Sequence, residues 1–176
     1  MKNYIDINCD LGEGIGNEKE ILPYISSANI ACGYHAGDED TMKRTIELCL
    51  EYGVAIGAHP SFPDKENFGR TNMILDADEL HNIMLDQIQT ISTIATSFGT
   101  KLQHVKPHGA LYNTIATNLV QAKAVIDAIL AYDSSLVLVA LAGSPLIEFA
   151  RKQGLRVVSE AFADRAYHRD GTLVSR

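Results

Sequence analysis

Tryptophan is absent from this chain of 176 residues, and cysteine occurs only three times, at Cys9, Cys32 and Cys49. The cysteines are widely spaced and form no C-x-x-C pair, which gives little support to a disulfide framework or a thiolate zinc site. No apolar run approaches the roughly 18 residues that span a bilayer. We therefore expect a chain without disulfides, and the sequence excludes an integral membrane protein.

Positive charge is also scarce in the sequence. The chain has 15 Lys and Arg against 22 Asp and Glu, and its formal net charge is −7. This sign is wrong for binding a phosphate backbone, so we expect no nucleic-acid partner. The first residues carry charge where a signal peptide would need an apolar stretch, which predicts a cytoplasmic location.

Nucleotide-binding and serine-hydrolase motifs are missing as well. Neither a P-loop (G-x-x-x-x-G-K-[ST]) nor a G-x-S-x-G nucleophile elbow occurs. A glycine-rich turn at Gly12–Gly16 follows a predicted strand, but it does not match G-x-G-x-x-G and places Glu13 where a phosphate would bind. These absences leave serine hydrolase chemistry and a phosphate cradle without support.

What the sequence does contain is a regular alternation of short apolar runs and amphipathic stretches. The apolar runs are Tyr4–Cys9, Asn29–Cys32, Val54–Ala58, Leu102–Lys106, Leu136–Leu141 and Arg156–Ser159. Helix-like spacing occurs at Asp40–Tyr52, from Asp76 to Gly99, at Leu119–Tyr132 and at Pro145–Gln153. This alternation predicts βαβ units around a parallel sheet, in one α/β domain over residues 1–176. Six strands suffice for an open doubly wound sheet and are too few for an eight-stranded barrel of about 250 residues.

Charged and histidine side chains follow five of the six predicted strands. They include Asp10 and Glu13 after the first strand, His35 after the second, His59 after the third, Lys106 and His108 after the fourth, and Glu160, Asp164 and Arg165 after the sixth; Asn29 lies in the second strand. The carboxyl ends of parallel strands meet at one edge of the sheet, where α/β folds bind their substrates. We therefore expect these side chains to share one cleft.

Two chemistries fit Asp, His and Lys at strand ends. One is general acid–base hydrolysis with cationic charge stabilisation, and the other is metal-assisted hydrolysis with histidine and carboxylate ligands. If a divalent metal is present, Asp10, His35 and His59 are its expected ligands. Other polar residues have structural interpretations: Asp38 is expected to cap a helix, His104 to pack in a strand, and His81 and His168 to lie on the surface.

At these residues the sequence resembles the LamB/YcsF family. The matching segments are Asp6–Gly14, Ala28–Asp38, Ile56–Ser61, Phe68–Arg70, Val105–Asn113 and Phe162–Arg165. The resemblance implies a barrel-like parallel (β/α) fold similar to glycoside hydrolase and deacetylase barrels. It also implies hydrolysis of 5-oxo-L-proline to L-glutamate coupled to ATP hydrolysis, with two partner subunits, B and C, that bind and use the ATP.

For that reaction, residue chemistry suggests individual roles. Asp10 is the expected base that deprotonates water, with His59 as the alternative, and His108 is the expected proton donor. Lys106 and Arg165 are expected to hold phosphoryl oxygens or the substrate carboxylate. The remaining residues of the expected substrate site are Glu13, Asn29, His35, Glu160 and Asp164.

The resemblance also implies that relatives continue for about seventy residues, enough for a last strand and helix of a barrel. The chain is thus expected to be short at its C-terminus relative to the family, which leaves its own activity open. Two other functions stay open: a metal-dependent deacetylase or amidohydrolase, and a protein that binds a ligand without catalysis.

Overall fold

A computed structural model of the chain describes residues 5–174. It contains six parallel strands: β1 (Asn8–Leu11), β2 (Ser27–Ala31), β3 (Ala55–His59), β4 (His104–Val105), β5 (Val137–Leu141) and β6 (Arg156–Glu160). The helices are α1 (Glu18–Ile21), the 3₁₀ turn η1 (Leu22–Tyr24), α2 (Glu39–Tyr52), α3 (Ala77–Ser97), α4 (Gly109–Thr117), α5 (Leu119–Asp133) and α6 (Pro145–Lys152). The expected α/β alternation is confirmed.

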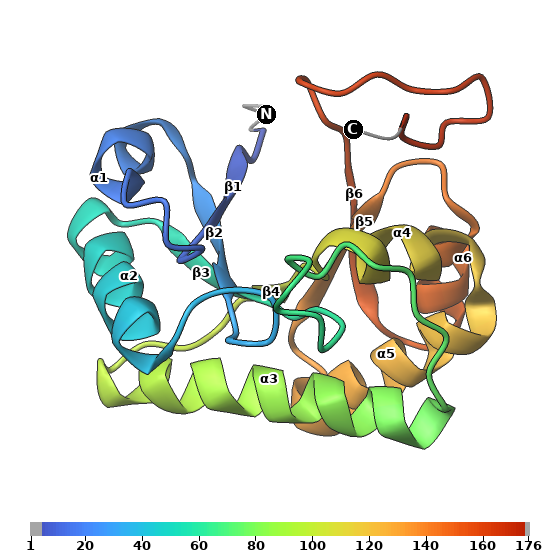
Figure 1. The fold of residues 1–176 in the computed structure, drawn as a ribbon, viewed down its shortest axis with the longest axis horizontal. Helices are drawn as coiled ribbons and strands as arrows, with labels where there is room; N and C mark the ends of the chain where they lie inside the picture. Colours follow the sequence, from blue (N-terminus) through green and yellow to red (C-terminus); the bar gives the residue numbers. More distant parts are fainter. Residues whose placement is uncertain (1–4, 175–176) are drawn as a thin grey trace.

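The strands lie in the sheet in the same order as in the sequence, from β1 to β6, and every neighbouring pair is parallel. A doubly wound sheet requires a reversal of strand order, which this sheet does not have. The open doubly wound sheet that six strands would allow is therefore excluded. Figure 1 shows α2 on one side, α3 along the base, and α5 and α6 on the other side, so that the helices surround the strands from outside. The fold is therefore a curled half-barrel of the barrel-like (β/α) class.

The two faces of the curled sheet differ in polarity. Ile30, Ala58, Val105 and Leu138 lie side by side in adjacent strands and belong to the buried core under the helices. Side chains alternate between faces along a strand, so the neighbouring positions point into the concave interior. Asp10, Asn29, Gly57 and His104 are paired across β1 to β4 at that level. The interior of the half-barrel is thus lined by polar residues.

Most predicted boundaries agree with the structure to within a few residues. Asp38 accepts a hydrogen bond from the Thr41 amide at 2.8 Å, which confirms its role as the cap of α2. Gly53 ends this helix with φ 68°, a conformation that favours glycine. The three cysteines are free thiols, as expected.

Two parts of the sequence prediction differ from the structure. The first strand begins at Asn8, because Ile5 and Ile7 are exposed and pairing with β2 starts at Ser27; Tyr4 lies outside the described residues. Helices α1 and α4 and the turn η1 were not expected, since no side-chain capping bond marks the start of any of them; His108 precedes α4 without one.

Within residues 5–174 no single helix is long and apolar enough to cross a bilayer. Helices α4 and α5 taken together would be long and apolar enough, but they are bent by 113° relative to each other.

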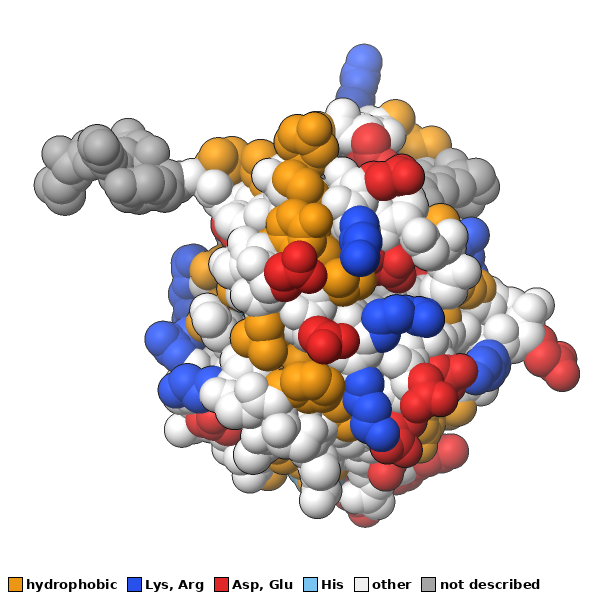
Figure 2. Space-filling model, turned by 90° about the vertical axis from the view of Figure 1, so that its left-hand side faces the viewer, with side chains coloured by type: hydrophobic (Ala, Val, Ile, Leu, Met, Phe, Trp, Pro, Cys, Tyr) orange, Lys and Arg blue, Asp and Glu red, His pale blue; other side chains and the backbone are white. Residues whose placement is uncertain are grey.

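Figure 2 shows the side of the molecule that carries α1 and α2, where acidic and basic side chains mix around a band of hydrophobic ones. This face has no uniform positive charge, the feature that marks a surface for a phosphate backbone.

Candidate functional site

Lys106 lies at the centre of the polar interior. Its Nζ is 3.1 Å from Oδ1 of Asp10 and 2.8 Å from Oε1 of Glu160, and it donates a hydrogen bond to Oδ1 of Asn8 at 3.0 Å. Burial alone would lower the pKa of Lys106, but the two carboxylates raise it above its ordinary value. The ammonium group is therefore a fixed positive charge on the floor of the site.

Asp10 is held from two sides. Asn29 donates to its Oδ1 at 2.8 Å, and Nε2 of His59 lies 3.4 Å from its Oδ2. Burial by itself would raise the pKa of Asp10, but His59, Lys106 and the Asn29 hydrogen bond hold it well below its ordinary value. The carboxylate therefore stays ionised at neutral pH.

A chain of hydrogen bonds supports Asp10 from below. His104 donates from Nε2 to Oδ1 of Asn29 at 2.8 Å, and Asn29 in turn donates to Asp10. His104 is buried, as expected for a packing residue, and burial lowers its pKa to about 4. Its ring occupies the space beside Gly57, where a Cβ would overlap it. His104 thus orients the amide that orients Asp10.

The three histidines at the strand ends form a compact cluster. His35 and His108 stack with their ring centroids 3.8 Å apart and their planes 3° from parallel, while His59 stands nearly perpendicular to His108. Oε1 of Glu13 lies 3.3 Å from Nε2 of His35 and 3.5 Å from Nδ1 of His108. Histidine side chains from the ends of three strands or the loops after them therefore converge on one carboxylate.

Both His59 and His108 use their outer ring nitrogens to bind the backbone. Nδ1 of His59 donates to the carbonyl of Lys106 at 2.6 Å, and Nε2 of His108 donates to the carbonyl of Phe68 at 2.9 Å. Burial lowers the pKa of His108 to about 3, with His59 and His35 acting in the same direction. A proton-donor role for His108 therefore requires an additional proton between the two rings and stays a prediction.

The Phe68–Arg70 loop packs against the start of α4. Phe68 has a positive φ of 57°, which is rare for a residue with a side chain. The amide of Ala110 donates to the carbonyl of Gly69 at 2.9 Å, and a Cβ on Gly109 would collide with that same carbonyl. This close approach presents the Phe68 carbonyl to His108 and places Arg70 at the cleft.

A cleft of about 550 Å³ opens above this floor. Asp10, His59, Lys106, His108 and Arg165 line it, together with Arg70, Asn72, Pro107, Gly109, Ala110, Tyr112, Asn113, Phe162, Leu173 and Val174. The expected residues are thus brought together with the exception of Asp164, which is exposed and does not line the cleft. Asn29, His35, Glu13 and Glu160 support the floor.

Three contributors were not among the expected site residues. Tyr112 donates from its hydroxyl to Oε2 of Glu160 at 3.0 Å, Asn8 bonds both Glu160 and Lys106, and Arg70 stands over the Phe68 ring at 5.1 Å. Asn8 could have been found from its position, because it lies two residues before Asp10 on the same strand face.

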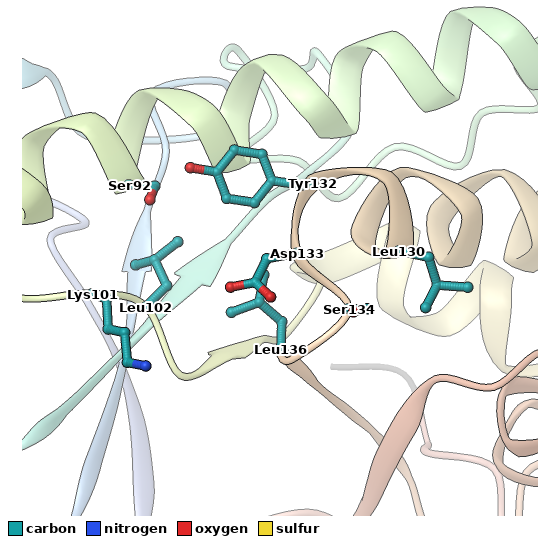
Figure 3. Close-up of a pocket in the computed structure, with 8 residues that line it drawn as sticks. All are labelled: Ser92, Lys101, Leu102, Leu130, Tyr132, Asp133, Ser134 and Leu136. Atoms are coloured by element: carbon teal, nitrogen blue, oxygen red, sulfur yellow. The ribbon is translucent and has the colours of Figure 1, made fainter.

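A second hollow of about 570 Å³ lies at the other end of the strands. Figure 3 shows its lining residues: Ser92, Lys101, Leu102, Leu130, Tyr132, Asp133, Ser134 and Leu136. Leu102 and Leu136 precede β4 and β5, so this hollow is at the amino ends of the strands. It contains no histidine and only one carboxylate, and the chemistry described above lies at the opposite end.

Several known proteins are similar to this chain in sequence or in structure. A relative from Acinetobacter baylyi, named as the A subunit of 5-oxoprolinase, is 56% identical over 177 residues, covering 98% of this chain and 70% of the relative. A relative of the same name from Bacillus cereus is 51% identical, with the same coverage. The crystal structure of a lactam utilization protein from Thermus thermophilus superposes with a TM-score of 0.94 at 44% identity, covering 99% of this chain and 72% of that chain.

The match to a family model covers almost the whole chain. The matching model is that of the LamB/YcsF family, which the sequence motifs resemble, and the match extends over residues 5–176. The shared geometry of a solved relative and the high identity of the curated relatives agree with it. The chain therefore belongs to the LamB/YcsF family.

Proposed function

We propose that this chain is the A subunit of an ATP-dependent 5-oxoprolinase and that its cleft opens the ring of 5-oxo-L-proline to give L-glutamate. The names of the relatives support this role. The observation that carries the proposal is the buried Lys106 between Asp10 and Glu160, on the floor of a cleft of about 550 Å³. A small lactam fits a site of this size.

Ring opening needs an activated carbonyl, because a lactam is a poor electrophile. Transfer of a phosphoryl group from ATP to the lactam oxygen makes the carbonyl carbon reactive toward water. As the water oxygen bonds to that carbon, negative charge grows on the oxygens around it, and Lys106 and Arg165 stand where they can hold this charge. The carbon–nitrogen bond then breaks, the ring nitrogen takes up a proton to become the amine, and the carbonyl carbon keeps the phosphoryl group as an acyl phosphate. A second water hydrolyses this acyl phosphate to give L-glutamate and inorganic phosphate.

The attacking water must lose a proton. Asp10 is ionised and lines the cleft, so it is the proposed acceptor, although its low pKa makes it a weak base. His59, which contacts Asp10, is the alternative base. Glu13 and Glu160 orient these groups through His35 and Lys106.

The nucleotide is proposed to bind through partner subunits, B and C, in the cytoplasm. The sequence has no P-loop, and Glu13 occupies the glycine-rich turn after β1, where it would repel a phosphate. The phosphoryl donor is therefore assigned to another polypeptide.

Reconstitution tests this proposal directly. The isolated chain should release neither phosphate from ATP nor glutamate from 5-oxoproline. Addition of the B and C subunits should give glutamate together with phosphate. ATP-dependent ring opening by the isolated chain would show that the nucleotide does not bind through the partner subunits. If the complex assembles but forms no glutamate, the result would favour a chain that binds a ligand without catalysis.

The second candidate function is a metal-dependent deacetylase or amidohydrolase. It is favoured by the cluster of Glu13, His35, His59 and His108, whose possible ligand atoms all lie within 4.8 Å of one another. Hydrolysis of an N-acetylated substrate by the isolated chain, without ATP, would support this candidate over the first.

A further inference from the structure

The facing nitrogens of His59 and His108 lack a proton between them when both rings are neutral. Nε2 of His59 lies 2.9 Å from Nδ1 of His108. The outer nitrogen of each ring donates its hydrogen to a backbone carbonyl, which can only accept. Each neutral ring has a single N–H, so two lone pairs point at each other. Something positively charged must lie between them.

Two carboxylate oxygens lie close to the facing nitrogens. Oδ2 of Asp10 is 3.4 Å from Nε2 of His59, and Oε1 of Glu13 is 3.5 Å from Nδ1 of His108 and 3.9 Å from Nε2 of His59. Metal–ligand bonds of about 2.0–2.2 Å in a tetrahedron separate neighbouring ligands by about 3.3–3.6 Å. Two of these four separations, 3.4 and 3.5 Å, already match. The 3.9 Å pair needs to close by about 0.3 Å, and the 2.9 Å pair needs to open by about 0.5 Å.

The groups behind these ligands are those that support a metal site. Histidines that bind a metal usually donate their other N–H to a carbonyl or carboxylate, as His59 and His108 do. Oδ1 of Asp10 is held by Lys106 and Asn29, which leaves Oδ2 for a ligand. Oε1 of Glu13, the oxygen that faces His59 and His108, also contacts Nε2 of His35.

His35 belongs to this supporting layer. An imidazole binds a metal in the plane of its ring, and the ring of His35 is stacked parallel to that of His108 at 3.8 Å. A cation in the plane of His108 therefore lies outside the plane of His35. The set expected from the sequence, Asp10, His35 and His59, changes accordingly: His108 and Glu13 replace His35.

We infer that Asp10, Glu13, His59 and His108 bind a divalent transition-metal cation such as Zn²⁺. Two imidazoles and two carboxylates are a donor set that such cations favour. A proton on Nε2 of His59 is the competing occupant: it would donate to Nδ1 of His108 at 2.9 Å and satisfy both nitrogens, but it leaves Oδ2 of Asp10 and Oε1 of Glu13 at 3.4 and 3.5 Å from the rings. The inference rests on the ligand geometry and not on the proposed function; a bound cation would take the Oδ2 of Asp10 and the Nε2 of His59 that the two proposed base roles need.

Calorimetric titration of the whole chain with Zn²⁺, after treatment with a chelator and its removal, tests the site. One Zn²⁺ should bind per chain, and thermal unfolding should shift upward with Zn²⁺ concentration, as for any ligand of the folded state. Co²⁺ should also bind and give the visible absorption of a tetrahedral site. His168→Gln, at an exposed histidine outside the cluster, is the control for surface binding.

Variants separate the ligands from their support. The double variant His59→Gln/His108→Gln and the single variant Glu13→Gln should lose stoichiometric binding and the thermal shift. His35→Asn should weaken Zn²⁺ binding by about 10–100-fold without abolishing it. Circular dichroism without metal shows whether each variant folds.

Two results would overturn the inference. One is a folded wild-type chain that binds neither Zn²⁺ nor Co²⁺ more tightly than the double variant does. The other is stoichiometric binding that survives in the double variant. Nitrogen-15 spectra of the histidines would then show a proton shared between His59 and His108, unaffected by metal.

Discussion

Asn8 donates a hydrogen bond to Glu160 across 2.8 Å, although the two residues are 152 positions apart and lie on β1 and β6, the opposite edges of the sheet. Lys106, from the end of β4, bonds both of them. The sheet is therefore curled far enough for its two edges to meet through side chains at the floor of the cleft. Lys106 is the link between the fold and the proposed chemistry.

Lys106→Met should reduce glutamate formation by the complete complex by about 10²-fold or more, because it removes the charge that holds developing negative charge. It should also lower the free energy of unfolding by about 3–5 kcal/mol, since the buried carboxylate of Glu160 loses its partner. Coupled turnover and urea unfolding measure the two effects. Lys101→Met, beside the distant hollow, is the control. Near-normal turnover of the Lys106 variant would remove this cleft from the reaction.

Asp10→Asn should reduce turnover of the complex by about 10²–10⁴-fold, the usual contribution of a general base. The amide keeps the size of the side chain, so the fold and the affinity for the partner subunits should be maintained. Steady-state kinetics, with complex assembly measured on the same samples, check this. If His59 is the base instead, His59→Gln will be the more damaging of the two substitutions.

The buried His104 predicts that stability falls in mild acid. Its pKa is lowered to about 4 in the folded chain, below the ordinary value near 6.5, so the unfolded chain takes up a proton that the folded chain refuses. The contribution of neutral His104 to the free energy of unfolding is fully present above pH 6.5. As the pH falls toward 4, the free energy of unfolding decreases by roughly 2–3 kcal/mol. Urea unfolding at pH 7 and pH 5 measures it. His104→Gln should be less pH-sensitive than wild type, and an unchanged slope would contradict the assignment.

Gly57→Ala should destabilise the chain by about 1–3 kcal/mol, because the new methyl group overlaps the ring of His104 and forces the backbone or the ring to move. The hydrogen bond from His104 to Asn29 should weaken with it. A double-mutant cycle with His104→Ala tests the cause, since the second substitution removes the overlap. Strictly additive effects would show that Gly57 is required for another reason.

Arg70→Met should raise KM for 5-oxoproline by about 10-fold or more while changing kcat less, because a hydrogen bond to a charged group contributes about 1.5–3 kcal/mol. The guanidinium lines the cleft and is held over Phe68, where it can meet the substrate carboxylate. Arg165→Met is the comparison, since Arg165 also donates to the carbonyl of Val174. A loss of kcat with unchanged KM would assign Arg70 to the reaction itself.

Local sequence patterns were enough to predict most helices, because caps and breakers act over a few residues. Asp38 and Gly53 bound α2 as their chemistry requires. The fourth strand was predicted at Leu102–Lys106 and is confirmed, although β4 pairs only His104 and Val105 with its neighbours. Helix α4 was not predicted, since it is set by packing of the Phe68–Arg70 loop.

The sequence by itself determined the α/β alternation, the absence of disulfides and the group of polar residues after the strands, because these follow from composition and periodicity. Only the tertiary structure decided the order of the strands, and with it the curl that joins Asn8 to Glu160. It also decided that His108 faces His59 while His35 stacks behind, a matter of ring orientation. Periodicity specifies which face of a strand a side chain occupies, but distances between loops depend on how the whole sheet bends.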